Sequence, residues 1–296
     1  SASLSPLVAD SSLWFTRGRG IALAICMCGI YVAGAVWPPV MQHFIDTAGW
    51  RATYFGLGAF CVLTMVPLAL CLRRPAPVTL PGQATGGAPA LKSARFLGRS
   101  DPAQPLGLAP GTLQWLLCVA GVSCCVAMAM PQVHIVAYCT DLGFGAAQGA
   151  QMLSLMMGLG IVSRLVSGWV SDHIGGLHTL LLGALLQGVA LLLFLPFDGL
   201  VPLYVVSGMF GLFQGGIVPS YALIVREYFS PAQAGARMGT VLMATLLGMA
   251  LGGWLSGAIF DWTGSYRAAF LNGLAWNLVN VGIVGFLVFR VRRSLR

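Results

Sequence analysis

Long apolar runs separated by short polar segments dominate this chain. Each run approaches or exceeds the roughly 20 residues that a helix needs to cross about 30 Å of hydrocarbon. The pattern predicts an all-α multi-pass membrane protein with eight transmembrane helices. The predicted spans lie near 21–45, 52–72, 112–139, 150–170, 178–197, 201–225, 238–260 and 268–289.

Charged residues make up 8% of the chain, whereas soluble proteins contain about 25%. Most of the sequence therefore cannot face water, and the lipid bilayer is an expected partner. The net charge of +8 is interpreted as membrane topology and contact with anionic lipid. Nucleic-acid binding would need a basic face on a soluble domain, so no nucleic-acid partner is expected.

A short phrase occurs twice between apolar runs, as Phe44–Tyr54 and, more loosely, as Ile259–Phe270. Six predicted spans separate Arg51 of the first copy from Arg267 of the second. Six is even, so both copies have the same orientation, which indicates a parallel repeat of two six-helix bundles. On this interpretation the first bundle contributes only its last two helices, and four more would precede them. A genuine eight-helix protein is the alternative.

Domain boundaries follow from the repeat and from local composition. We expect the end of an N-terminal bundle over 1–74, a flexible linker over the proline-rich 75–110, and a C-terminal six-helix bundle over 111–296. The linker composition cannot bury a core. Most basic residues fall in segments on one side, which the positive-inside rule makes cytoplasmic. They are Arg17, Arg19, Arg73, Arg74, Lys92, Arg95, Arg99, Arg226, Arg237, Arg290, Arg292, Arg293 and Arg296. The linker and C-terminus are thus predicted to be cytoplasmic, in the plasma (cell inner) membrane.

A loop motif carries the first family resemblance. The stretch Gly168–Gly176 is similar to the Gly-x-x-x-Asp-Arg-x-Gly-Arg signature of major facilitator proteins. The resemblance implies the major facilitator fold, with these helices equivalent to 5 through 12, and a gating role for the motif. The matching gating residues are Gly168, Asp172, His173 and Gly175. His173 and Gly176 replace residues that are usually basic, which implies a weakened or pH-dependent ion-pair latch. Asp172 can instead cap the next helix.

Three further segments resemble the monocarboxylate-porter and oxalate/formate-exchanger group. They are Trp14–Ala22, Gly49–Tyr54 and His134–Gly143. The resemblance implies secondary active transport of small, monocarboxylate-like organic anions by alternating access, through proton symport or anion exchange. A small organic anion, and a proton under symport, are the implied partners. The protein is expected to be a monomer.

Arg164 is the candidate for the central substrate contact. It lies eight residues before Asp172, hence about 12 Å inside the membrane at about 1.5 Å per residue. A guanidinium at that depth costs roughly 2.5–3.5 kcal/mol, and a carboxylate substrate could bind it through two parallel hydrogen bonds. In the resembled group an arginine in this helix has that role, with an aspartate one turn earlier; here that position is Gly160. Snorkelling, or bonding to carbonyls of a neighbouring helix, is the alternative.

Other polar residues at membrane depth are further candidates for substrate binding. They are Gln132, His134, Gln214, Tyr221 and Asn277. His134 could also carry a coupled proton, because histidine titrates near neutral pH. Hydrogen bonding between helices is the alternative role for all of them.

The sequence contains few features of a catalytic or metal-binding site. It contains no paired catalytic carboxylates, no Ser/His/Asp arrangement and no His-Glu-x-x-His spacing. The eight cysteines lie mostly in apolar runs without zinc-like pairing to histidine, which favours packing. We therefore expect no enzyme activity, no cofactor and no metal. A non-transporting receptor or regulatory protein, or an inactive fragment of a facilitator, remains the alternative to a transporter.

Overall fold

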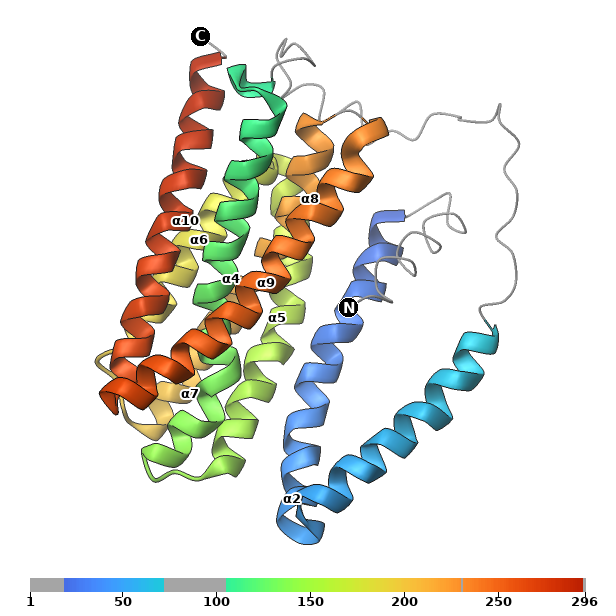
Figure 1. Cartoon of the computed structure of the whole chain (residues 1–296), viewed down its shortest axis with the longest axis vertical. Coiled ribbons are helices and arrows are strands. Elements are labelled where there is room, and N and C mark those ends of the chain that lie inside the picture. The colour runs from blue at the N-terminus through green and yellow to red at the C-terminus, as the bar shows by residue number, and fades with distance from the viewer. Residues whose placement is uncertain (1–18, 72–104, 230, 295–296) are drawn as a thin grey trace. The chain divides into compact units, whose positions relative to one another are not determined.

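The computed structural model describes residues 19–71, 105–229 and 231–294, and the chain divides into two units, 1–87 and 88–296 (Figure 1). The elements in the described residues are all helices, which confirms the predicted all-α class. Residues 75–104 of the predicted linker lie outside the described residues.

The first unit consists of α2 (Arg19–Cys71), which bends sharply at Gly49. Its apolar part, Cys28–Leu70, is 43 residues long and would measure about 65 Å if straight. A bilayer core is about 30 Å thick, so this length needs two passes. Figure 1 shows two arms meeting at the bend, and they correspond to the predicted spans 21–45 and 52–72.

The second unit holds the remaining six candidate spans of the described chain. Because α7 and α8 together form one span, 200–228, these six spans match the six predicted from 112 onward. The elements are η1 (Pro105–Gly107), α4 (Pro110–Asp141), α5 (Ala146–Ile174), α6 (Gly176–Leu193), α7 (Leu200–Gln214), α8 (Ile217–Tyr228), α9 (Pro231–Thr263) and α10 (Tyr266–Ser294).

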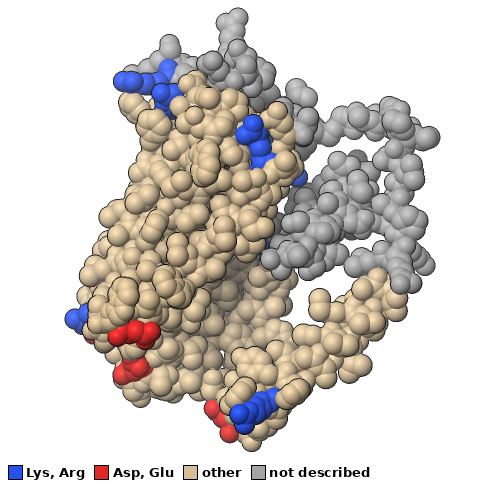
Figure 2. Space-filling view, viewed as in Figure 1, with Lys and Arg blue, Asp and Glu red and all other residues tan. Residues whose placement is uncertain are grey.

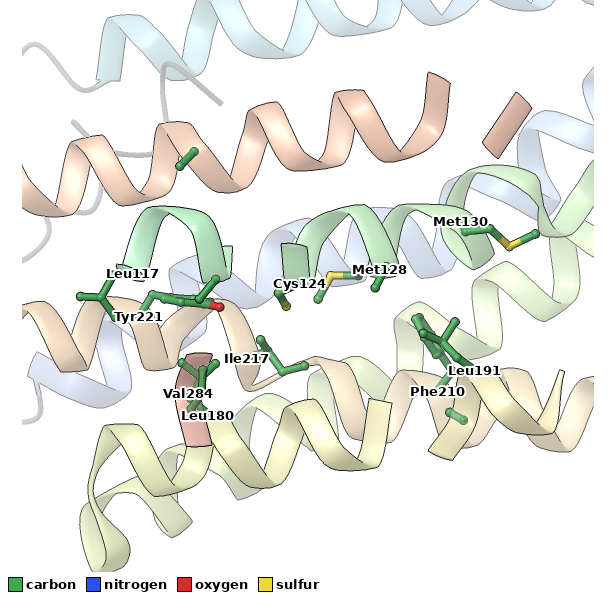
Figure 3. Packing of buried hydrophobic residues seen from close by; sticks show 14 of the residues in the cluster. Leu117, Cys124, Met128, Met130, Leu180, Leu191, Phe210, Ile217, Tyr221 and Val284 are labelled. Carbon is green, nitrogen blue, oxygen red and sulfur yellow. The ribbon is translucent and has the colours of Figure 1, made fainter. Parts of the chain in front are cut away.

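Helix α4 is the centre of the second unit. In its most apolar stretch 72% of residues are buried, against 22% to 28% for α5, α9 and α10. Figure 3 shows Leu117, Cys124, Met128 and Met130 of α4 among buried side chains from α6, α7, α8 and α10. The other helices are thus arranged around α4, which is the most enclosed span of the second unit.

Both copies of the repeated phrase form a turn between two helices. Gly49 has φ 80° within α2, and Gly264 has φ 64° between α9 and α10. Positive φ is readily available only to glycine, which explains its place in both copies. The two arginines differ in their contacts: Arg51 stacks over the Trp50 ring at 4.8 Å, whereas Arg267 pairs with Asp198 at 2.7 Å.

Charge separates the two ends of the second unit. Figure 2 shows lysine and arginine gathered at one end, and acidic residues with a smaller basic spot at the other. At the basic end Arg290 donates to the carbonyls of Leu106 and Gly107, at 3.3 and 3.1 Å, which fastens η1 to α10. The residues immediately before α4 therefore pack with the bundle.

Helices α4 and α9 approach closely through glycines. A Cβ on Gly252 would lie 2.6 Å from both Cα and the carbonyl oxygen of Val126. A Cβ on Gly248 would lie 2.6 Å from the Val122 carbonyl oxygen. Such contacts do not occur in close-packed interiors, so any side chain at these positions would force the helices apart.

Replacing Gly252 with alanine should therefore destabilise the protein, by about 1–3 kcal/mol for overpacking. Gly253→Ala is the matched control, because its Cβ would meet Val133 Cγ2 at an ordinary 3.5 Å. Alanine raises helix propensity equally at both positions. Thermal unfolding in detergent should show a lower Tm for Gly252→Ala only, and equal Tm values would contradict this account of the contact.

Candidate functional site

The span formed by α7 and α8 is interrupted in the middle, at Gly215 and Gly216. The cause lies four residues further on, at Pro219. In a regular helix the N–H of residue 219 would bond to the Gly215 carbonyl, but proline has no N–H and its ring crowds that carbonyl. In hydrocarbon a backbone carbonyl without a donor is costly, so another group must bond to it.

Arg164 supplies that donor. Its Nε donates to the Gly215 carbonyl at 3.3 Å, and the arginine is 9% exposed. The guanidinium predicted near the midplane is therefore held at the break by a carbonyl of a neighbouring helix, as the alternative interpretation anticipated. A guanidinium has five N–H donors. A bond through Nε and a bidentate bond to a carboxylate therefore use different donors.

Glycines allow α5 to reach the break. A Cβ on Gly215 would lie 2.8 Å from Ser163 Cβ and would also clash with the Gly160 carbonyl. A Cβ on Gly211, one turn earlier, would collide with the backbone of Met156. Gly160 therefore lies where the two spans press together.

A glutamine pair lies next to the same break. Gln132 Nε2 of α4 donates to Gln214 Oε1 at 2.7 Å, and Gln214 is the last residue of α7. Gln214 is fully buried, and its Nε2 has no hydrogen-bond partner in the structure. Two of the candidates, Gln132 and Gln214, thus bond to each other at the break, and Arg164 bonds to the backbone of the next residue, Gly215.

His134 lies on α4 near Gln132 but contacts other elements. Its Nε2 is 2.9 Å from the Gly253 carbonyl of α9, and its ring centroid is 5.9 Å from that of Tyr266. A histidine held by a neighbouring carbonyl is the ordinary structural arrangement for such a residue.

Tyr221 and Asn277 are buried elsewhere in the bundle. The Tyr221 hydroxyl donates to Asn280 Oδ1 at 3.2 Å, and both residues are 0% exposed. Asn277 is 1% exposed, and its Oδ1 would lie 3.0 Å from a Cβ on Gly188. Both residues are enclosed in the interior of the second unit.

The loop motif forms the turn from α5 into α6. Gly175 alone joins the two helices, with φ 82°, which explains a glycine there. His173 and Asp172 are exposed. Nδ1 of His173 is 2.8 Å from the Trp169 carbonyl, and the two rings are tilted against each other with centroids 4.4 Å apart. A Cβ on Gly168 would meet open space.

Sequence reasoning missed Glu227. Its Oε1 accepts a hydrogen bond from the Gly176 N–H at 3.1 Å, at the start of α6. This is the capping role considered for Asp172, performed by a residue from α8. A Cβ on Gly176 would lie 3.0 Å from Ile224 Cγ1, so a larger residue is disfavoured here. The only clue in the sequence was an acidic residue near a membrane-span end.

Metal ligands do not gather in the described part of the chain. Across 19–71, 105–229 and 231–294 there is no group of three or more His, Cys, Asp or Glu side chains that could hold an ion. Within the described residues of the second unit, the buried charged side chain is the guanidinium of Arg164.

These features define a multi-pass membrane protein whose second unit carries a buried cation at mid-span. A family model described as Major Facilitator Superfamily matches residues 1–201 and 161–296, which together span the chain. The chain therefore belongs to the Major Facilitator Superfamily, and the predicted family is confirmed.

Individual relatives are similar over most of this chain. Monocarboxylate transporter 13 of Rattus norvegicus is 25% identical over 95% of the chain and 63% of the relative. Monocarboxylate transporter 12 of Mus musculus is 26% identical over 98% of the chain and 64% of the relative. Agnestins efflux protein AgnL12 of Paecilomyces divaricatus is 22% identical over 95% and 61%. The chain thus spans about three-fifths of the length of these relatives.

The bond between Arg164 and Gly215 predicts a coupling with Pro219. Pro219→Ala restores an N–H to the Gly215 carbonyl, so it should stabilise an Arg164→Met variant more than it stabilises the unmodified protein. A buried carbonyl left unsatisfied costs about 1–3 kcal/mol, which sets the expected coupling energy. A double-mutant cycle on unfolding in detergent measures it, and equal effects of Pro219→Ala in both backgrounds would contradict the bond.

Proposed function

We propose that the protein carrying this chain transports small organic anions of the monocarboxylate class by alternating access. The observation that carries the proposal is Arg164, a cation 9% exposed in the middle of a membrane span. Ionisable residues at such depth are expensive and commonly mark substrate paths. Membership of a transporter family, and relatives named monocarboxylate transporters, support the same reading.

The way Arg164 is held suits a carboxylate. Its bond from Nε to a backbone carbonyl restrains the guanidinium, which has further N–H donors on its two Nη atoms. A planar fork held in this way can bind a planar carboxylate through two hydrogen bonds, which a lysine could not do. The break in α7–α8 thus orients the proposed anion-binding group.

The Gln132–Gln214 pair is proposed to contact the rest of the substrate. Gln132 is only partly buried, and the pair joins α4 to α7 beside Gly215. Amide groups offer both donors and acceptors, so a small acid bearing a polar substituent fits this neighbourhood. Tyr221 and Asn277 are proposed to maintain the bundle, because they are enclosed in its interior.

Alternating access would move the six-helix bundle as a body about the proposed site. Gly160 provides no carboxylate beside Arg164, so we propose exchange of one anion for another as the driving mode. Proton symport through His134 is the competing mode, and a dependence of uptake on an imposed pH gradient would reveal it. The plasma membrane, with the linker and C-terminus cytoplasmic, is the proposed location.

Uptake in proteoliposomes tests the role of Arg164. With the full gene product reconstituted, Arg164→Met and Arg164→Lys should each lower carboxylate uptake by at least about tenfold, because the bidentate bond is lost. Radiolabelled lactate or pyruvate serves as the probe, with an unlabelled monocarboxylate inside the vesicles for exchange.

The double variant Arg164→Met/Pro219→Ala separates binding from structure. It restores a donor to the Gly215 carbonyl without restoring a guanidinium. If Arg164 binds substrate, the double variant recovers stability but remains inactive. Recovery of uptake would show that the arginine only supports the helix break. Substrate binding without uptake in the unmodified protein would instead indicate a receptor.

A further inference from the structure

A crevice of about 150 Å³ opens between α5, α6 and the α7–α8 span. Its walls include Val162 and Val166 of α5, Leu182 of α6, and Gly216 at the helix break. All of these positions belong to candidate membrane spans of the second unit. The crevice therefore lies at membrane depth, and it does not include Arg164, Gln132 or Gln214.

Two of the three hydroxyl groups that line the crevice are bonded within their own helices, and the third is that of Ser163. Thr179 Oγ1 donates to the Gly175 carbonyl at 2.9 Å, and Ser167 Oγ donates to the Ser163 carbonyl. The remaining lining residues are aliphatic residues and glycines, together with Phe213. Water in a cavity needs two to four polar partners, so this space favours a hydrocarbon occupant over water or a polar solute.

The mouth of the crevice continues into an exposed aliphatic stripe on α6. Leu182, Leu185, Val189 and Leu192 recur at helical spacing and are between 45% and 49% exposed. Leu182 also lines the crevice. On a membrane span such a stripe faces lipid, because exposed aliphatic side chains are stable in contact with hydrocarbon.

We propose that this crevice binds one acyl chain of a bilayer lipid, inserted between α5 and α6 as far as the Gly215–Gly216 break. Gly216 and Ser167 both line the crevice, and a Cβ on Gly216 would collide with the Ser167 side chain, so α5 contacts the break there. The acyl chain completes packing against the outer side of the break. This lipid site is independent of the anion transport proposed above.

A substitution at Val166 can block the crevice, and the same substitution at the neighbouring Leu165 is the matched control. Val166 is 54% exposed and lines the crevice, whereas Leu165 is 55% exposed and does not. Val166→Trp should fill the mouth with an indole ring, and Leu165→Trp should add the same ring to a surface outside the crevice. Both changes place an aromatic residue at one depth in the same helix.

The test uses the purified chain in nanodiscs of phosphatidylcholine whose acyl chain carries a photoactivatable diazirine. After irradiation, peptide mapping should find label concentrated on 162–170 and 182–186. Val166→Trp should lower this labelling by at least about fivefold, since a close-packed crevice has no room for both ring and chain. Leu165→Trp should leave it unchanged.

Equal labelling in the two variants, or label spread evenly over the exposed stripes of all helices, would overturn the proposal. Size-exclusion elution and circular dichroism confirm that each variant is folded. If Val166→Trp does not fold, Val162→Trp plugs the same face of α5 one turn earlier, with the same expected loss. Native mass spectrometry provides a second measurement, in which one retained phospholipid should be lost on plugging and kept in the control.

Discussion

The central constraint on the second unit is that a backbone carbonyl in hydrocarbon cannot bond to water. Pro219 removes the donor that the Gly215 carbonyl would have used, and Arg164 of α5 replaces it at 3.3 Å. That replacement needs α5 and the α7–α8 span in close contact, which the absence of side chains at Gly211 and Gly215 permits. A proline, a set of glycines and an arginine thus depend on one another across two helices.

The helix break connects two regions of different chemistry. Next to it lie the guanidinium of Arg164 and the glutamine pair, which can form directional hydrogen bonds. The break also borders a largely aliphatic crevice, in which two of the three lining hydroxyls bond within their own helices. A small polar anion and a lipid chain are thus proposed beside one backbone feature. Any rearrangement of α8 during transport would alter the surroundings of both.

Close packing around α4 explains how a buried break can be maintained. The helix is enclosed along most of its length, and α9 approaches it at Gly248 and Gly252. At the acidic end, Asp198 accepts hydrogen bonds from Arg267 and from Tyr138 of α4. These contacts hold the ends of α4 and α10 to the loop before α7. Partly exposed ion pairs of this kind contribute little energy individually, so their role is one of alignment.

Much of the architecture could be predicted from the sequence, because helices that cross a lipid bilayer need long apolar runs. The lengths of the apolar runs predicted the membrane spans. The repeated phrase coincides with the turns that the structure forms at Gly49 and Gly264. The candidate site could be predicted from the sequence only in part. Arg164 stands out by its charge, and Gln132 and Gln214 by their depth, but their convergence joins residues far apart in the chain. Glu227, which caps α6, had no sequence pattern linking it to Gly176.

The sequence by itself determined the class of protein, the membrane spans and the presence of a cation at mid-depth. It could do so because hydrophobicity, helix length and proline chemistry are local properties of the chain. Only the tertiary structure decided which carbonyl Arg164 bonds, which amides meet beside it, and which polar residues are enclosed among α6, α8 and α10. Those outcomes depend on helix rotation and on approach distances at glycines, and both are set by the packing of all the helices together.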